Sequence, residues 1–135
     1  MADLLTLDGL ETLAARLWSE CRGGSVVWLT GTLGSGKTTF VRGLTRVAGA
    51  EPARSPTYAL VHQYASPEGP IVHVDCYRLK QPEEAADLEL DRLARDSRLL
   101  LIEWPERAGA WAPPATVTLA FSHDPVPDRR RVEWR

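Results

Sequence analysis

Val26–Thr39, with the sequence VVWLTGTLGSGKTT, decides how this chain folds. An apolar run typical of a buried strand ends at Leu29, and the residues after the motif suit a helix. Between them, residues 31–38 match the complete Walker A pattern Gly-x-x-x-x-Gly-Lys-Thr. Glycines let successive backbone N–H groups point inward around phosphate oxygens, because no Cβ blocks the approach. The strand before the motif and the helix after it supply the context that the pattern requires, so the stretch predicts a site for nucleotide phosphates.

Two residues of this loop have separate predicted tasks. A helix that begins near Lys37 presents unpaired N–H groups and the positive end of its dipole to an anion. The Lys37 ammonium can reach the β- and γ-phosphates, and the Thr38 hydroxyl can hold Mg²⁺. The loop therefore predicts binding of a nucleotide triphosphate together with a divalent cation.

Length and composition predict one domain over residues 1–135, since 135 residues with 44% hydrophobic content fit a single core. A net charge of −2 argues against a surface built throughout for nucleic acid. Cys21 and Cys76 lack metal-ligand spacing and are expected to be buried apolar residues. The sequence has neither a basic N-terminal region nor a long apolar run. We therefore expect a cytoplasmic protein with no membrane association.

Hydrophobic periodicity and turn residues predict the order of the remaining elements. The segment 51–58 contains Pro52 and Pro56 and is assigned to an extended loop, because proline disfavours helix interiors and central strands. The expected elements are a strand at 4–7, a helix capped by Asp8 and ended by Gly23-Gly24, the Walker A strand and a helix to Val47, an extended loop at 51–58, a hairpin of 59–64 and 71–75, a helix at 82–96, a buried strand at 99–102, a loop with one helical turn at 108–114, and a hairpin of 116–121 and 131–134.

This order predicts an α/β fold, a P-loop NTPase-like three-layer domain with a mixed central β-sheet and helices on both faces. The nucleotide is expected at the carboxyl ends of the central strands. Two apolar strands finish there with an acid, IVHVD at Asp75 and LLLIE at Glu103. This is the Walker B arrangement, in which a carboxylate holds Mg²⁺ directly or through water. A strand also often finishes with a solvated acid, so the alternative for either residue alone is a coincidental strand end.

Several residues keep more than one interpretation. Thr57 lies either in a switch loop that senses the γ-phosphate or in an ordinary proline turn. Arg78 is either a positive charge for the phosphates or the partner of a nearby acid. Trp104 belongs to the core, to a base-stacking surface or to a lid. The run at 129–131 is either a charged edge strand or a nucleotide, tRNA or partner contact. His62, His73 and His123 show no ligand spacing and are interpreted as structural.

The sequence also separates functional classes. It contains no asparagine, so the Asn-Lys-x-Asp element that recognises guanine is missing, and ATP is the expected nucleotide. A small-molecule kinase would need an arginine-bearing lid and an acceptor pocket, and the segment 79–98 offers Arg92, Arg95 and Arg98 but little room. A binding module without catalysis has no need of Lys-Thr together with two acids. An ATP hydrolase is therefore favoured over both alternatives.

Four blocks of sequence, in order, resemble the bacterial TsaE (YjeE) family of small P-loop ATPases. They are GTLGSGKTT at 31–39, SPTY at 55–58, HVDCYRL at 73–79 and IEWP at 102–105, and the likeness covers roughly residues 10–132. The resemblance implies weak intrinsic ATP hydrolysis. It also implies work with the TsaB–TsaD complex, which places threonylcarbamoyl groups on tRNA, with ATP turnover resetting that complex and tRNA reached indirectly or through it.

The resemblance also assigns roles to residues. It implies that Lys37, Asp75 and Thr57 act in catalysis, with Asp75 orienting water, and that Thr38 and Glu103 hold Mg²⁺. Two positions depart from the family pattern, because Thr32 stands where Asp is usual and Leu10 falls near a frequent threonine. The implied nucleotide-binding residues are Gly34, Ser35, Gly36, Lys37, Thr38, Thr39, Trp104 and Arg130.

Overall fold

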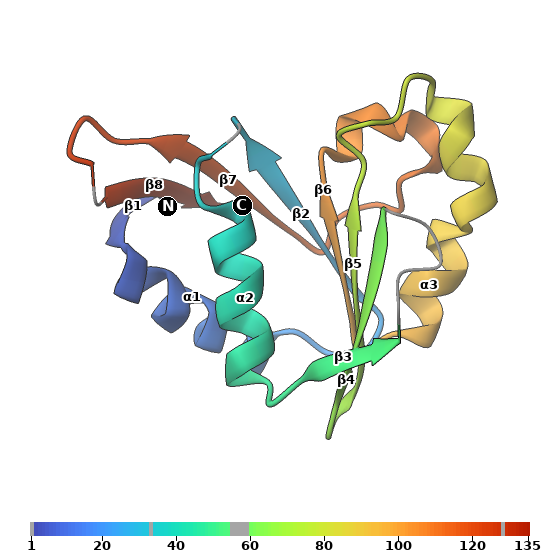
Figure 1. Ribbon diagram of the computed structural model, residues 1–135, viewed down its shortest axis with the longest axis horizontal. Helices are drawn as coiled ribbons and strands as arrows, with labels where there is room; N and C mark the ends of the chain where they lie inside the picture. The colour runs from blue at the N-terminus through green and yellow to red at the C-terminus, as the bar shows by residue number, and fades with distance from the viewer. Residues whose placement is uncertain (1, 33, 55–59, 128) are drawn as a thin grey trace.

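A computed structural model describes residues 2–32, 34–54, 60–127 and 129–135. Helices and strands alternate up to α2, three strands follow in succession, and two more strands end the chain (Figure 1). Short 3₁₀ helices (η) precede and follow β6. The elements are β1 (Ala2–Thr6), α1 (Leu7–Glu20), β2 (Ser25–Gly31), α2 (Lys37–Val47), β3 (Glu51–Arg54), β4 (Val61–Ser66), β5 (Gly69–Asp75), η1 (Pro82–Leu88), α3 (Leu90–Asp96), β6 (Leu99–Glu103), η2 (Pro105–Arg107), η3 (Gly109–Trp111), β7 (Val117–His123) and β8 (Arg129–Trp134).

The strands of the described chain form one eight-stranded sheet in the order β1-β8-β7-β2-β6-β5-β4-β3. The four central strands β7, β2, β6 and β5 are parallel. An antiparallel pair flanks them on each side, β8 with β1 and β4 with β3. Parallel neighbours end at the same edge of a sheet. The carboxyl ends of β2, β5 and β6 therefore come together. This arrangement brings Asp75 and Glu103 to the same edge of the sheet as the Walker A loop.

Alternating side chains of the central strands build two cores, one on each face of the sheet. In β6, Leu99 and Leu101 pack with α1 and α2, while Leu100 and Ile102 pack with η1 and α3. A run buried on both faces is typical of a parallel strand. Figure 1 shows α1 and α2 on one side of the sheet and α3 on the other. The predicted mixed sheet with helices on both faces is confirmed.

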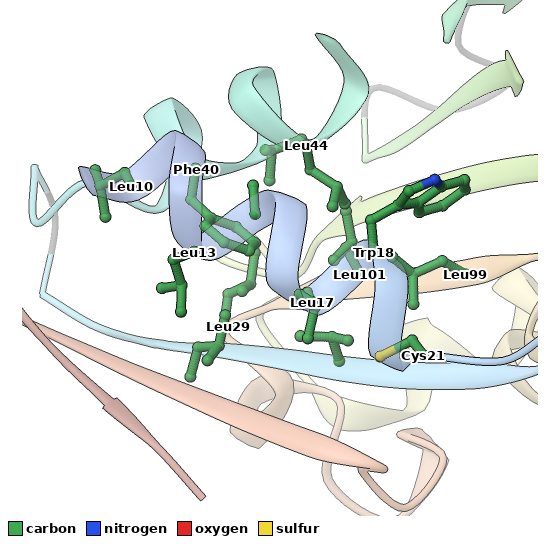
Figure 2. Close-up of a cluster of buried hydrophobic side chains, with 14 of the residues drawn as sticks. Leu10, Leu13, Leu17, Trp18, Cys21, Leu29, Phe40, Leu44, Leu99 and Leu101 are labelled. Atoms are coloured by element: carbon green, nitrogen blue, oxygen red, sulfur yellow. The ribbon is translucent and has the colours of Figure 1, made fainter. Parts of the chain in front are cut away.

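The buried stripe of the first helix is also as predicted. Its members Leu10, Leu13, Ala14, Leu17, Trp18 and Cys21 all belong to the core beneath α1 and α2. Figure 2 shows this stripe facing Phe40 and Leu44 of α2 and Leu29 of β2. The stripe holds α1 across α2 and so fixes the helix that follows the Walker A loop. The helix begins at Leu7, one residue before the predicted cap, and ends at Glu20 rather than at the glycines.

Two expectations about the middle of the chain are wrong. Residues 51–54, expected as loop, form the edge strand β3, which a proline tolerates because one side of an edge strand has no ladder partner. The helix expected at 82–96 is broken into η1 and α3 at Glu89, whose φ of 51° is left-handed. A left-handed residue cannot continue a right-handed helix, so the chain turns there.

None of the helices that the structure describes is long and apolar enough to cross a bilayer.

Candidate phosphate-binding site

The Walker A loop connects the end of β2 at Gly31 to the start of α2 at Lys37. Gly36 occupies the N-cap of α2 with φ 107°, a left-handed conformation that side chains disfavour. A Cβ at Gly36 would lie 3.4 Å from both Arg130 Cγ and Leu10 Cδ1. The motif glycine therefore lets the loop pass closely between α1 and β8 while its backbone stays open on the side of the cavity.

Gly31 is the residue of the loop at which a side chain is least tolerated. Its φ is 129°, and a Cβ would lie 2.1 Å from the carbonyl oxygen of Phe121 in β7. We expect Gly31→Ala to destabilise the fold by about 3 kcal/mol or more, because positive φ and backbone overlap act together. Urea unfolding measures this loss.

The matched control is Gly23→Ala, since a Cβ at Gly23 meets nothing within 4 Å. Equal unfolding midpoints for Gly31→Ala and Gly23→Ala would show that the Phe121 carbonyl does not restrict position 31.

Lys37 is the first residue of α2, and only 4% of it is exposed. Its Nζ donates a hydrogen bond to the Gly31 carbonyl oxygen at 2.7 Å, so the side chain folds back over the loop. Burial lowers the pKa of the Lys37 ammonium below its usual value, while the carboxylates of Glu103, Asp75 and Glu106 act in the opposite direction. The Lys37 ammonium thus lies within the electrostatic field of Asp75 and Glu103. From there it can also contact a phosphate bound in the loop.

Asp75 and Glu103 end the neighbouring parallel strands β5 and β6 and are register partners. Glu103 is 4% exposed, and its Oε2 lies 2.5 Å from His73 Nε2. Asp75 Oδ1 accepts the backbone N–H of Tyr77 at 3.0 Å. Each carboxylate therefore has a hydrogen-bond partner: His73 on β5 for Glu103, and the backbone just after β5 for Asp75. Both acids open into the same cavity as the loop.

This cavity has a volume of about 200 Å³. It brings together segments separated by most of the chain: the Walker A loop, the ends of β5 and β6, and the C-terminal strand β8. Its lining residues are Gly34, Gly36, Lys37, Thr38, Thr39, Asp75, Tyr77, Glu103, Trp104 and Arg130.

Trp104 stands between the loop and an exposed arginine. Its φ of 57° is left-handed, which turns the chain sharply after β6. The Lys37 ammonium lies 4.0 Å from the centre of the indole ring. The ring packs on Tyr77 at a centroid distance of 5.1 Å, and the Arg107 guanidinium lies 5.6 Å from its centre. Trp104 thus forms a wall of the cavity and also packs, half-buried, against the core around β6 and α3.

The family of the chain follows from sequence comparison. The sequence profile of the family described as "Threonylcarbamoyl adenosine biosynthesis protein TsaE" matches residues 5–132. The chain belongs to the TsaE family. This confirms the resemblance carried by the four sequence blocks.

Curated TsaE proteins from several bacteria are similar to the chain, and each is named a tRNA threonylcarbamoyladenosine biosynthesis protein. The one from Streptomyces coelicolor is 42% identical, with 72% of this chain and 68% of that protein aligned. Those from Aquifex aeolicus and Haemophilus influenzae are each 36% identical, covering 70% and 80% of this chain and 68% of each relative. The crystal structure of Bacillus subtilis YdiB superposes with a TM-score of 0.75 at 22% identity, over 99% of this chain and 86% of that one. That superposition supports the fold.

Most residues that the TsaE resemblance assigns to the nucleotide meet in the cavity. Ser35 does not line it, because its buried hydroxyl donates to the Thr32 carbonyl oxygen at 2.6 Å. Thr57 lies outside the described residues. Their predicted roles stay predictions.

Arg130 reaches the cavity from β8, nearly at the end of this TsaE chain. Its Nη1 donates to the carbonyl oxygens of Pro127 and Arg129 at 2.9 and 3.0 Å. Its Nε is buried and has no hydrogen-bond partner within the described part of the chain. The aliphatic part of the Arg130 side chain lies beside Gly36, and its buried Nε belongs to the guanidinium. Arg130 therefore places positive charge against the loop.

Sequence reasoning missed two residues of this region, Tyr77 and His73. Tyr77 follows the acid of β5 by two positions, and no spacing marked it as a cavity wall. His73 carried a signal that was available, because it occupies the same strand face as Asp75, two positions earlier. A polar residue on a core-facing position of a buried strand calls for a partner, and that partner is Glu103.

Proposed function

We propose that this protein is a Mg²⁺-dependent ATPase of low intrinsic rate that supports the TsaB–TsaD complex in threonylcarbamoyladenosine modification of tRNA. The observation that carries the proposal is the single cavity that joins the Walker A loop to Asp75 and Glu103. The names of the similar proteins support the tRNA pathway. Action on tRNA implies a cytoplasmic location.

The triphosphate would lie against the backbone of the loop and the first turn of α2. There, N–H groups without helical partners and the helix dipole favour an anion. Lys37 Nζ would exchange its bond with the Gly31 carbonyl for phosphate oxygens, and Arg130 would add a second positive charge. Both cations already face the cavity, so neutralising the phosphates requires local side-chain movement only.

The residues present fit a magnesium ion. The Thr38 hydroxyl and the Glu103 carboxylate both line the cavity, and oxygen ligands of this kind suit Mg²⁺, which usually combines one or two protein ligands with substrate phosphates. Bound there, the ion would neutralise charge on the phosphate oxygens during transfer.

Asp75 would orient the water that attacks the γ-phosphate in line with the leaving oxygen. The hydrogen bond from the Tyr77 backbone fixes one of its oxygens and leaves the carboxylate facing the cavity. Thr57 is proposed to sense the γ-phosphate from a switch-like segment. The low basal rate follows if the water or a positive charge is positioned fully only when the partner docks.

The test is release of γ-phosphate measured with and without purified TsaB, TsaD and tRNA. We expect slow Mg²⁺-dependent release of free phosphate from labelled ATP, faster when the partners are added. Transfer of label to a nucleoside or metabolite would favour the kinase alternative. A binding module predicts bound ATP but no release, even with all partners present.

A further inference from the structure

A polar row runs across three strands next to the cavity. It consists of His73 on β5 and Glu103 on β6, which are buried, and His62 on β4, which is half-buried. His73 Nε2 lies 2.5 Å from Glu103 Oε2, and the two residues are 8% and 4% exposed. The rings of His62 and His73 stack with centroids 6.0 Å apart and an interplanar angle of 27°.

Strand register explains why these side chains meet. His73 pairs with Leu101 and Asp75 pairs with Glu103, so all four point to the sheet face covered by α1 and α2. His62 is the register partner of His73 on the other side. An imidazole on this face stands among leucines, and a buried polar group without a partner costs about 1–3 kcal/mol. Its bond to Glu103 offsets that cost.

The contact has a direction. An ionised carboxylate only accepts hydrogen bonds, so when Glu103 is ionised the donor in this contact is Nε2 of His73 and the acceptor is Oε2. Glu103 lines the cavity, whereas His73 does not. Any effect of His73 on the nucleotide or its cation therefore passes through the orientation of the Glu103 carboxylate.

We propose that His73 is a positioning residue that holds one oxygen of Glu103 and thereby presents the other to the divalent cation of the bound nucleotide. The proposal rests on the function proposed above. Carboxylates that bind metals are commonly held by such outer hydrogen bonds, and losing one typically lowers metal affinity about 10- to 100-fold.

The test uses Mn²⁺ with ADP as the probe, because electron paramagnetic resonance counts bound Mn²⁺ without requiring turnover. His73→Leu removes the donor, and His73→Gln keeps an N–H close to the position of Nε2. We expect Mn²⁺ to bind about 10- to 100-fold more weakly to His73→Leu. His73→Gln should recover most of that loss.

His62→Leu is the matched control, since it alters the ring stacked on His73 and leaves the His73–Glu103 hydrogen bond in place. It is expected to leave Mn²⁺ affinity near that of the unaltered protein. Equal affinity in His73→Leu and the unaltered protein overturns the proposal. So does an equal loss in His73→Leu and His73→Gln, or in His73→Leu and His62→Leu.

Thermal unfolding of each variant separates binding from folding. If His73→Leu does not fold, His73→Asn replaces it, because its shorter amide keeps polarity but cannot reach Oε2. The inference then requires weaker Mn²⁺ binding to His73→Asn than to His73→Gln, and equal binding overturns it. If the unaltered protein itself binds no Mn²⁺ with ADP, it is the proposed function that fails.

Discussion

Lys37→Ala is expected to lower the affinity for ATP about 10- to 100-fold. The Lys37 ammonium is buried at the start of α2, and its charge lies within the field of Asp75 and Glu103. Without it, the acids would face the phosphates with one fewer cation between them. A charge-assisted hydrogen bond contributes about 1.5–3 kcal/mol, and each 1.4 kcal/mol corresponds to a factor of ten. Isothermal calorimetry with ATP and Mg²⁺ measures the change.

The chain provides its own control, because it contains one other lysine, Lys80, which is exposed and outside the cavity. Lys80→Ala should bind ATP as the unaltered protein does. If Lys37→Ala also bound ATP with unchanged affinity, the phosphates would have to lie elsewhere, and the role given to the Walker A loop would be wrong.

Glu103→Gln is expected to slow Mg²⁺-dependent hydrolysis on the order of 100-fold while changing nucleotide affinity much less. The amide keeps the volume of the side chain in a buried position, so the main loss is negative charge at the proposed ion site. Phosphate release at saturating ATP, followed over a Mg²⁺ titration, measures the effect. The Mg²⁺ concentration for half-maximal rate should also rise.

Glu106→Gln is the matched control for Glu103. It removes a carboxylate three residues further along, which also acts on Lys37 but is exposed and lies outside the cavity lining. Its hydrolysis should stay close to normal. Normal hydrolysis by Glu103→Gln at saturating Mg²⁺ would remove Glu103 from the metal site.

The sequence predicted the parts of the site that depend on local pattern. The Walker A loop is a contiguous motif, and Asp75 and Glu103 follow apolar strands whose parallel pairing was implied by the α/β order. Arg130 is different. It reaches Gly36 only because β8 pairs with β7 next to β2, and sequence pattern alone left its strand as either an edge or a contact. Family resemblance supplied that assignment.

The remaining misses have physical causes. The 3₁₀ turn and the break at Glu89 are set by how η1 and α3 pack on the sheet, because Leu88 and Leu90 both enter the same core on either side of the break. Helical periodicity continues across 82–96, so it carries no sign of the interruption. His73 was interpreted as structural because spacing rules search for ligands along one segment, whereas its partner lies on the neighbouring strand.

The close approach of Gly31 to Phe121, and of Gly36 to Arg130, gives the C-terminal hairpin a mechanical role. The first glycine of the phosphate loop lies against β7, and the last lies against β8. Because a Cβ at Gly31 would already overlap the Phe121 backbone, a displacement of the hairpin is expected to move the loop as well. A protein that binds the outer surface of this hairpin is therefore expected to change the affinity for the phosphates without entering the cavity.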